Sequence, residues 1–297
     1  MARRTKKTDD ETDTEGKAPS GLIERTLSIL ELLAANARGL QIYEIAEFLQ
    51  IPRSATHRVL TSLVEHGYVR QEREHGAYQL TVKIASLGFR YLSGSGITDL
   101  AQPIIDRLAN EAGELVRLAM IDGKDLIWVA KAQGSPYGLR YDPDMGQIGR
   151  LSCSASGIAW LACLPDEKAL ELVERQGFGP RDQYGPRAPE NRKALLKYLQ
   201  QTRKRGFSVT IQTYTSWMNA TAAAIKNPHS GEVIGTVVIA GPHIRLTEEK
   251  MVELSPYLLQ AASELSLAMI ASPGLIPSPG RRPSFFQSAV GPKTKSA

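Results

Sequence analysis

The amino-acid sequence predicts an α+β protein in which a winged helix-turn-helix precedes an α/β domain. Residues 42–66 show two helical patterns separated by a short turn, and two strand patterns follow at residues 68–71 and 77–80. From Leu115 onward, strand and helix patterns are mixed. The length of 297 residues suits about two domains of ordinary size.

The first part, which we call the head (residues 20–82), begins with two predicted helices. Ser20 is a suitable N-cap for the first helix. Apolar side chains expected on one face of that helix are Ile23, Leu27, Leu30 and Ala34. Gly39 ends the pattern, and a second apolar stripe at helical spacing follows: Ile42, Ile45, Ala46 and Leu49.

The third predicted helix has one polar and one apolar side. Pro52 suits its first position, where the missing N–H costs nothing. The polar side chains recur at helical spacing: Ser54, His57, Arg58 and Thr61. The predicted buried side is Ala55, Val59, Leu60, Leu63 and Val64. Because no acidic residue lies between Ile51 and Val64, this helix can enter a major groove without repelling phosphates.

Seven side chains are therefore the predicted DNA contacts: Arg53, Ser54, Thr56, His57, Arg58, Thr61 and Arg73. Arg58 is expected to reach a phosphate or a guanine edge, and Arg73 in the wing the DNA backbone. Net charge alone does not carry this prediction. The chain has a net charge of +5, but residues 20–95 contain eight Lys/Arg against seven Asp/Glu. The alternative is an ordinary amphipathic helix in a small bundle, and the complete order with a wing favours DNA binding.

The remaining patterns predict linker helices and a mixed C-terminal domain. Helices are expected at 82–91, 97–108, 152–163, 166–175, 191–205 and 247–270, and strands at 115–121, 126–132, 137–141, 207–212, 220–226 and 233–240. The segment 93–96, Ser-Gly-Ser-Gly, reads as a flexible joint. The predicted divisions are a disordered tail (1–19), the winged helix-turn-helix (20–82), linker helices (83–112), the C-terminal domain (113–271) and a disordered tail (272–297).

Several function classes are disfavoured. Cys153 and Cys163 are the two cysteines, so neither a disulfide framework nor a zinc site is expected. No nucleotide-binding or hydrolase motif occurs, and no cofactor is predicted. Cys153 stands at a predicted helix start, which favours a thiolate, but it lacks a local base and is better interpreted as a packed small residue. Without a membrane-length apolar run or a signal core, a cytoplasmic location is expected.

Over residues 20–270 the chain resembles the IclR family of bacterial transcription regulators. The matching segments in the head are Glu24-Arg25, Ile45-Ala46, Pro52-Arg-Ser54, His57-Arg58-Val-Leu60, Gly67-Tyr-Val69 and Tyr78-Gln-Leu80. Those beyond it are Ser154-Ala-Ser-Gly157, Arg205-Gly-Phe207, Ala222-Ala223 and Gly241-Pro242. The resemblance implies a GAF-like effector domain, dimers or tetramers on pseudo-palindromic operators, and a small organic effector. It also implies control of catabolic operons, with repression favoured over activation.

The chain departs from the family where the effector is expected. The family's common histidine before the buried helix is replaced by Ser152, beside Cys153. Polar pocket positions of relatives that bind small carboxylates align with Thr210, Ala220, Val238 and Ala240, and Trp217 precedes an apolar strand. Those seven positions are the predicted effector-binding residues. Because most of the aligned positions are apolar, the resemblance implies an effector that is larger and more hydrophobic than pyruvate, such as an aromatic compound.

Three alternatives remain open at this point. The protein could activate rather than repress, its C-terminal domain could serve only to form oligomers, or that domain could be catalytic.

Overall fold

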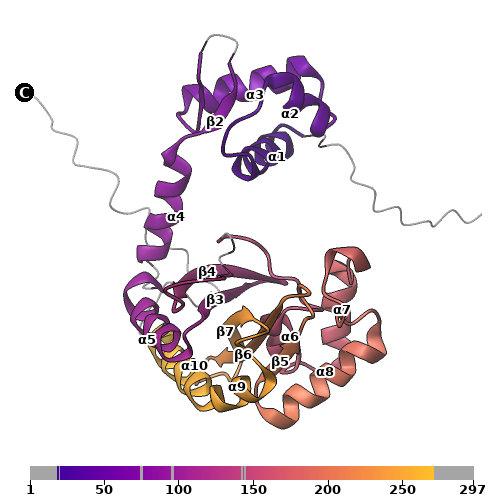
Figure 1. Cartoon of the computed structure of the whole chain (residues 1–297). Coiled ribbons are helices and arrows are strands. Elements are labelled where there is room, and N and C mark those ends of the chain that lie inside the picture. Colours follow the sequence, from indigo (N-terminus) through magenta and orange to yellow (C-terminus); the bar gives the residue numbers. More distant parts are fainter. Residues whose placement is uncertain are drawn as a thin grey trace, which may run out of the picture. The chain divides into compact units, whose positions relative to one another are not determined.

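The computed structural model describes residues 19, 21–73, 76–94, 97–141, 143 and 145–270 (Figure 1). The chain divides into two units, residues 1–91 and 92–297, and each is described by itself. The predicted tails, apart from Pro19, lie outside the described residues, as do the predicted cap Ser20 and the second half of the 93–96 joint.

The head has the predicted order of a winged helix-turn-helix. Its elements are α1 (Leu22–Ala35), α2 (Ile42–Phe48), α3 (Arg53–Glu65), β1 (Val69–Gln71) and β2 (Tyr78–Leu80), followed by α4 (Val82–Gly94). Strands β1 and β2 pair in antiparallel fashion, and Leu40 forms a bridge to Tyr78. The wing is thereby attached to the segment between α1 and α2.

The buried face of α1 differs from the prediction. Ile29, Leu32 and Leu33 enter the head core, whereas Ile23 and Leu27 are 76% and 53% exposed. The N-terminal half of α1 is apolar on several sides, so periodicity alone allowed two stripes, and packing against α3 and β2 selected the one near the C-terminus. Val64 on α3 is also exposed rather than buried.

The second unit is built on a five-stranded antiparallel sheet in the order β4-β3-β7-β6-β5. The strands are β3 (Leu115–Asp122), β4 (Asp125–Gln133), β5 (Ser208–Ile211), β6 (Met218–Lys226) and β7 (Val233–Pro242). The helical elements are a π-helical turn (Ile97–Ala101), α5 (Gln102–Ala112), α6 (Ala155–Leu161), α7 (Asp166–Gln176), a 3-10 turn (Arg181–Gln183), α8 (Arg192–Arg205), α9 (Glu248–Glu253) and α10 (Ser255–Ile270).

Helices cover both faces of this sheet. Helices α5 and α10 contact one face, and α6 contacts the other, with α8 behind it (Figure 1). Because side chains alternate along a strand, each strand contributes to two separate apolar clusters, one on each face. The predicted α+β class with a GAF-like second domain is confirmed.

Three predicted elements differ in detail. Residues 137–141 form a loop instead of a strand, held by the amide of Gln133, which donates to the Tyr141 carbonyl at 3.1 Å. The last helix is broken at Leu254, where Pro256 in the new first turn lacks an N–H to continue the ladder. The predicted helix at 152–163 begins only at Ala155, because Ser154 caps it by accepting from Gly157 N at 3.0 Å.

Within the described part of the chain, no helix is long and apolar enough to cross a membrane.

Candidate nucleic-acid interface and ligand pocket

Helix α3 presents a polar face to solvent. Ser54, His57, Arg58 and Thr61 are all exposed. The opposite face is buried in the head core through Ala55, Val59, Leu60 and Leu63. The apolar face thus packs α3 into the head, and the polar face is accessible to a groove of DNA.

The turn before α3 fixes its entry into the head. Gln50 has a left-handed φ of +52°, a conformation that costs free energy for a residue with a Cβ atom. Ile51 N then donates to the Ala46 carbonyl at 2.9 Å. Pro52 is the N-cap and Arg53 begins the helix, one position later than predicted. The first turn of α3 carries no acidic side chain, so its positive dipole end can approach a phosphate.

Thr56 is a correction to the predicted contacts. Its side chain is fully buried, and its hydroxyl donates to the Pro52 carbonyl at 3.3 Å. A threonine can occupy this inward position because the helix backbone satisfies its hydroxyl. Thr61, by contrast, is exposed, although its hydroxyl also donates to a backbone carbonyl, that of His57 at 2.9 Å.

We expect Thr56→Val to change DNA affinity less than twofold, because the side chain faces the core. The substitution removes one hydrogen bond and should lower the free energy of unfolding by about 1 kcal/mol. Titration of a bound DNA duplex in a gel-shift assay measures the first value, and urea unfolding the second. A tenfold loss of affinity in a folded Thr56→Val protein would return Thr56 to the interface.

The wing supplies further cations. Arg73 is exposed just before the turn that joins β1 to β2, and residues 74 and 75 of that turn lie outside the described residues. Arg70 Nε and Nη2 donate to Gln79 Oε1 across the strand pair, at 3.3 and 3.0 Å. Arg70 is therefore oriented by Gln79 within the wing, and Arg73 is exposed next to the turn.

The second unit contains a small pocket between the sheet and α6, with a cavity volume of about 30 Å³. The sheet contributes Arg117, Trp128, Thr210, Met218, Ala220, Val238 and Ala240. The opposite wall consists of Tyr141, Ser154, Ala155, Ser156 and Tyr214. This cavity volume is about that of one water molecule, so a larger ligand requires the side chains of the walls to move apart.

One cation lies inside this pocket. Arg117 is only 4% exposed, and its guanidinium carbon is 3.8 Å from the centre of the Trp128 ring. Burial lowers the pKa of Arg117 to about 10, so the side chain still carries its charge at neutral pH. Burial also raises the pKa of Tyr141 to about 12 and raises the pKa of Tyr214. The phenols are therefore neutral.

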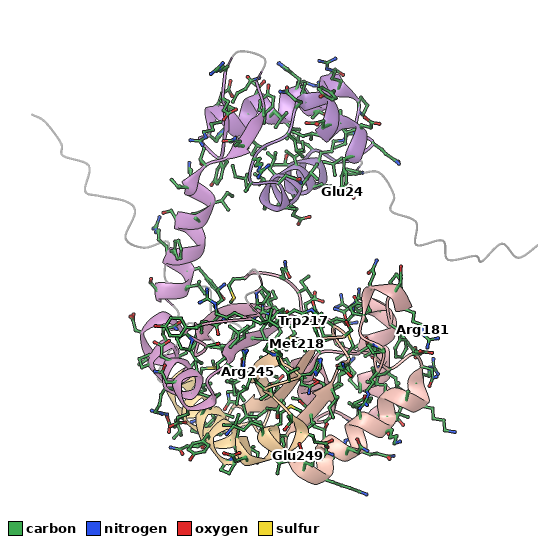
Figure 2. All side chains as sticks on the ribbon, viewed as in Figure 1. Glu24, Arg181, Trp217, Met218, Arg245 and Glu249 are labelled. Atoms are coloured by element: carbon green, nitrogen blue, oxygen red, sulfur yellow. The ribbon has the colours of Figure 1, made fainter. Side chains whose placement is uncertain are left out.

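Of the seven predicted effector-binding residues, four line the pocket: Thr210, Ala220, Val238 and Ala240. Thr210 Oγ1 donates to the Ala220 carbonyl at 3.0 Å, so its hydroxyl proton is already engaged. Trp217 does not line the pocket. It is 36% exposed and contacts Tyr141 edge-on, with 5.6 Å between ring centroids, next to Met218, which does line it (Figure 2).

Ser152 and Cys153 are corrections, because both are buried behind the pocket wall rather than in it. Burial raises the pKa of Cys153 to about 12, so the thiol stays protonated and the residue is a packed side chain. In the described ranges, no cluster of three or more His, Cys, Asp or Glu side chains is placed to bind a metal.

Sequence reasoning did not single out Arg117, Trp128, Tyr141 or Tyr214. Arg117 had a signal, because it is a charged residue inside an otherwise apolar strand. The two tyrosines belong to loops, and only the closed fold brings them to the pocket.

Comparison with known proteins identifies both units. The family profile "IclR helix-turn-helix domain" matches residues 22–73, and "Bacterial transcriptional regulator IclR C-terminal" matches residues 89–267. The transcriptional repressor IclR of Escherichia coli is 29% identical over 248 residues, covering 83% of this chain and 89% of that protein.

Solved structures agree with this result. The crystal structure of Thermotoga maritima IclR is 25% identical, with a TM-score of 0.66, and covers 83% of this chain and 98% of its own. An IclR homolog from Microbacterium hydrocarbonoxydans, complexed with 4-hydroxybenzoate, has a TM-score of 0.70 at 19% identity and shares the fold over 85% of this chain and all of its own. Because the C-terminal profile alone spans more than half of the chain, this protein belongs to the IclR family of bacterial DNA-binding transcriptional regulators.

Proposed function

We propose that this regulator is a repressor whose operator binding is controlled by a small, largely hydrophobic organic effector. The DNA-binding role is assigned to residues 20–82, the effector role to residues 113–271, and the connection between them to helices in 83–112. The observation that carries the proposal is the presence in one chain of the polar α3 face and the pocket between the sheet and α6. A ligand can shift the equilibrium between a state that binds the operator and a state that does not only if its affinities for the two states differ.

Repression and an aromatic effector have support from relatives. The similar proteins with established roles include the IclR and AllR repressors of Escherichia coli. The fold neighbour from Microbacterium is complexed with 4-hydroxybenzoate, a flat ring of the kind that apolar walls accommodate. Activation of the same operon type is the second candidate, and the sign of regulation in a reporter strain lacking this gene decides between them.

We further propose a homo-oligomer acting in the cytoplasm, without catalytic activity. Large apolar side chains remain exposed on α1 and α4: Leu22, Ile23, Leu27, Val82, Phe89 and Tyr91. Contact with a second copy would remove this surface from water, and two recognition helices would then read a palindromic operator. The protonated thiol of Cys153 argues against a nucleophile in the C-terminal domain.

The test uses the full chain in two steps. DNA is first selected from a random pool, and we expect a pseudo-palindromic site that binds in the nanomolar range typical of specific complexes. Thermal unfolding is then measured across a metabolite panel. A ligand present at about 100 times its Kd should stabilise the folded state by about 2.7 kcal/mol, and the same ligand should alter the affinity for the selected site.

Different results of these two experiments would contradict different parts of the proposal. Failure to select any DNA would refute the proposed role of α3. Selection of DNA with no stabilising ligand in a broad panel would favour a C-terminal domain that only forms oligomers. Turnover of a panel compound that is lost in Cys153→Ala would favour the catalytic alternative.

A further inference from the structure

We infer that the acidic segment at residues 9–15 binds a groove in the head beside the recognition helix α3 and competes there with DNA. The N-terminal segment is then an autoinhibitory element of the same chain. This inference rests on the proposed role of α3, because the segment can inhibit only if the polar face of α3 binds DNA.

The groove lies between the start of α1 and one side of α3, and its cavity volume is about 500 Å³. Its accessible lining is Leu22, Arg25 and Thr26 of α1 together with Arg58 and Ser62 of α3, since the other lining residues are buried. Four of these five side chains are polar, so the groove suits a polar occupant. Arg58 is also a predicted DNA contact, and an occupant of the groove therefore covers part of the DNA-binding face.

The charge of the groove favours an anion. Among the lining residues, Arg25 and Arg58 are cations and none is Asp or Glu. Arg25 Nε donates to the Pro19 carbonyl at 3.0 Å. In the described part of the head, neither guanidinium is within ion-pair distance of a carboxylate. Two cations on one groove attract a run of carboxylates more strongly than either does alone.

The sequence supplies such a run next to the groove. Residues 9–15, Asp-Asp-Glu-Thr-Asp-Thr-Glu, contain five carboxylates and no apolar side chain. The run ends four residues before Pro19, whose carbonyl accepts from Arg25 of the groove wall. Four residues span at most about 14 Å, so the tether allows the carboxylates to reach this groove. A short tether also gives an effective concentration of about millimolar, at which weak ion pairs become populated.

The alternative occupant is a second copy of the chain. The apolar side chains assigned above to contact between copies include Ile23 and Leu27, which do not line the groove, and the two contacts share only Leu22. The polar lining and the adjacent run of acids therefore favour the segment as the occupant.

Cross-linking in the full-length protein tests whether the segment lies in the groove. Thr12→Cys places a thiol in the segment and Ser62→Cys places one in the groove, in a Cys163→Ser background that removes the exposed native thiol. Under mild oxidation we expect this pair to form a disulfide at least about fivefold faster than the control pair Thr12→Cys and Ser86→Cys. Ser86 is exposed on α4 and lies outside the groove.

DNA affinity tests whether the segment inhibits, with the duplex selected from the random pool as the probe. A five-amide variant carries Asp9→Asn, Asp10→Asn, Glu11→Gln, Asp13→Asn and Glu15→Gln. At low salt it should bind the duplex at least about threefold tighter than the wild-type protein, and this gain should shrink as salt screens the ion pairs. It should also remove the difference in cross-linking rate.

Arg25→Gln separates competition from a general effect of charge. Loss of a cation by itself weakens binding to DNA. If Arg25 holds the segment, Arg25→Gln should instead bind the duplex tighter than the wild-type protein, and it should give no such gain in the five-amide background.

Equal cross-linking rates at positions 62 and 86 would refute occupation of the groove by the segment. Labelling of Ser62→Cys by a maleimide that slows with protein concentration, and not with the five acids, would assign the groove to a second copy instead. If the disulfide forms as expected but neither the five-amide variant nor Arg25→Gln binds DNA more tightly, competition with DNA is wrong. If no duplex is selected at all, the proposed role of α3 fails, and the cross-linking rates still decide whether the segment occupies the groove.

Discussion

Replacing Arg58 with alanine is expected to weaken operator binding more than tenfold while the head remains folded. Arg58 is exposed on the polar face of α3, and the structure gives it no ion pair with a described residue. Removing the Arg58 side chain should therefore change the free energy of unfolding of the head very little. A bidentate contact to guanine contributes about 1–3 kcal/mol of discrimination, and a phosphate contact contributes through counterion release.

Salt dependence distinguishes the two kinds of contact. If Arg58 binds phosphate, the slope of log affinity against log salt should fall by about 0.9 in Arg58→Ala. If Arg58 instead contacts guanine, the salt slope should stay the same, and the preference for guanine at one base pair of the site should weaken. Arg90→Ala on α4 is the matched control, since Arg90 is exposed but lies outside α3. Equal affinity of Arg58→Ala and the wild-type protein for the selected site would contradict the assignment of α3.

The α3 face could be predicted from the sequence because a single helix obeys one period. The spacing of Ser54, His57, Arg58 and Thr61 fixed their common direction without knowledge of the rest of the fold. The errors fell at the edges of the two stripes. Thr56 is inward and Val64 outward, and at such border positions the neighbouring elements, rather than the period, decide burial.

The pocket could be predicted only in part, because it depends on the order of strands. The resemblance to the family, through its aligned pocket positions, led to Ala220, Val238 and Ala240. Placing Arg117 and Trp128 beside them requires that β3 pair with both β4 and β7, a long-range arrangement that local patterns do not specify. Residues at loops, such as Tyr214, have no periodicity at all.

Replacing Arg245 with methionine should lower the stability of the second unit by about 1–3 kcal/mol, because the buried carboxylate of Glu114 loses its partner, while the 37% exposure of the Arg245 side chain reduces the cost. Glu114 is 5% exposed. Arg245 Nε and Nη2 donate to its two carboxylate oxygens at 2.6 and 2.9 Å, and Nη2 also donates to the Leu139 carbonyl at 2.9 Å. The pair therefore joins the start of β3 to the segment after β7 and to the loop before the pocket residue Tyr141.

Tryptophan fluorescence during urea unfolding measures this effect on the second unit alone, because Trp128, Trp160 and Trp217 all lie in it. The matched control is Arg107→Met, whose ion pair with Glu264 is much more exposed and should contribute less than about 1 kcal/mol. Adding Glu114→Gln to Arg245→Met removes the stranded charge and should restore part of the loss. If Arg245→Met were no more destabilising than Arg107→Met, the carboxylate of Glu114 would have to find water or another donor. The ion pair would then be a surface contact, and the loop beside the pocket would be held by its other hydrogen bonds.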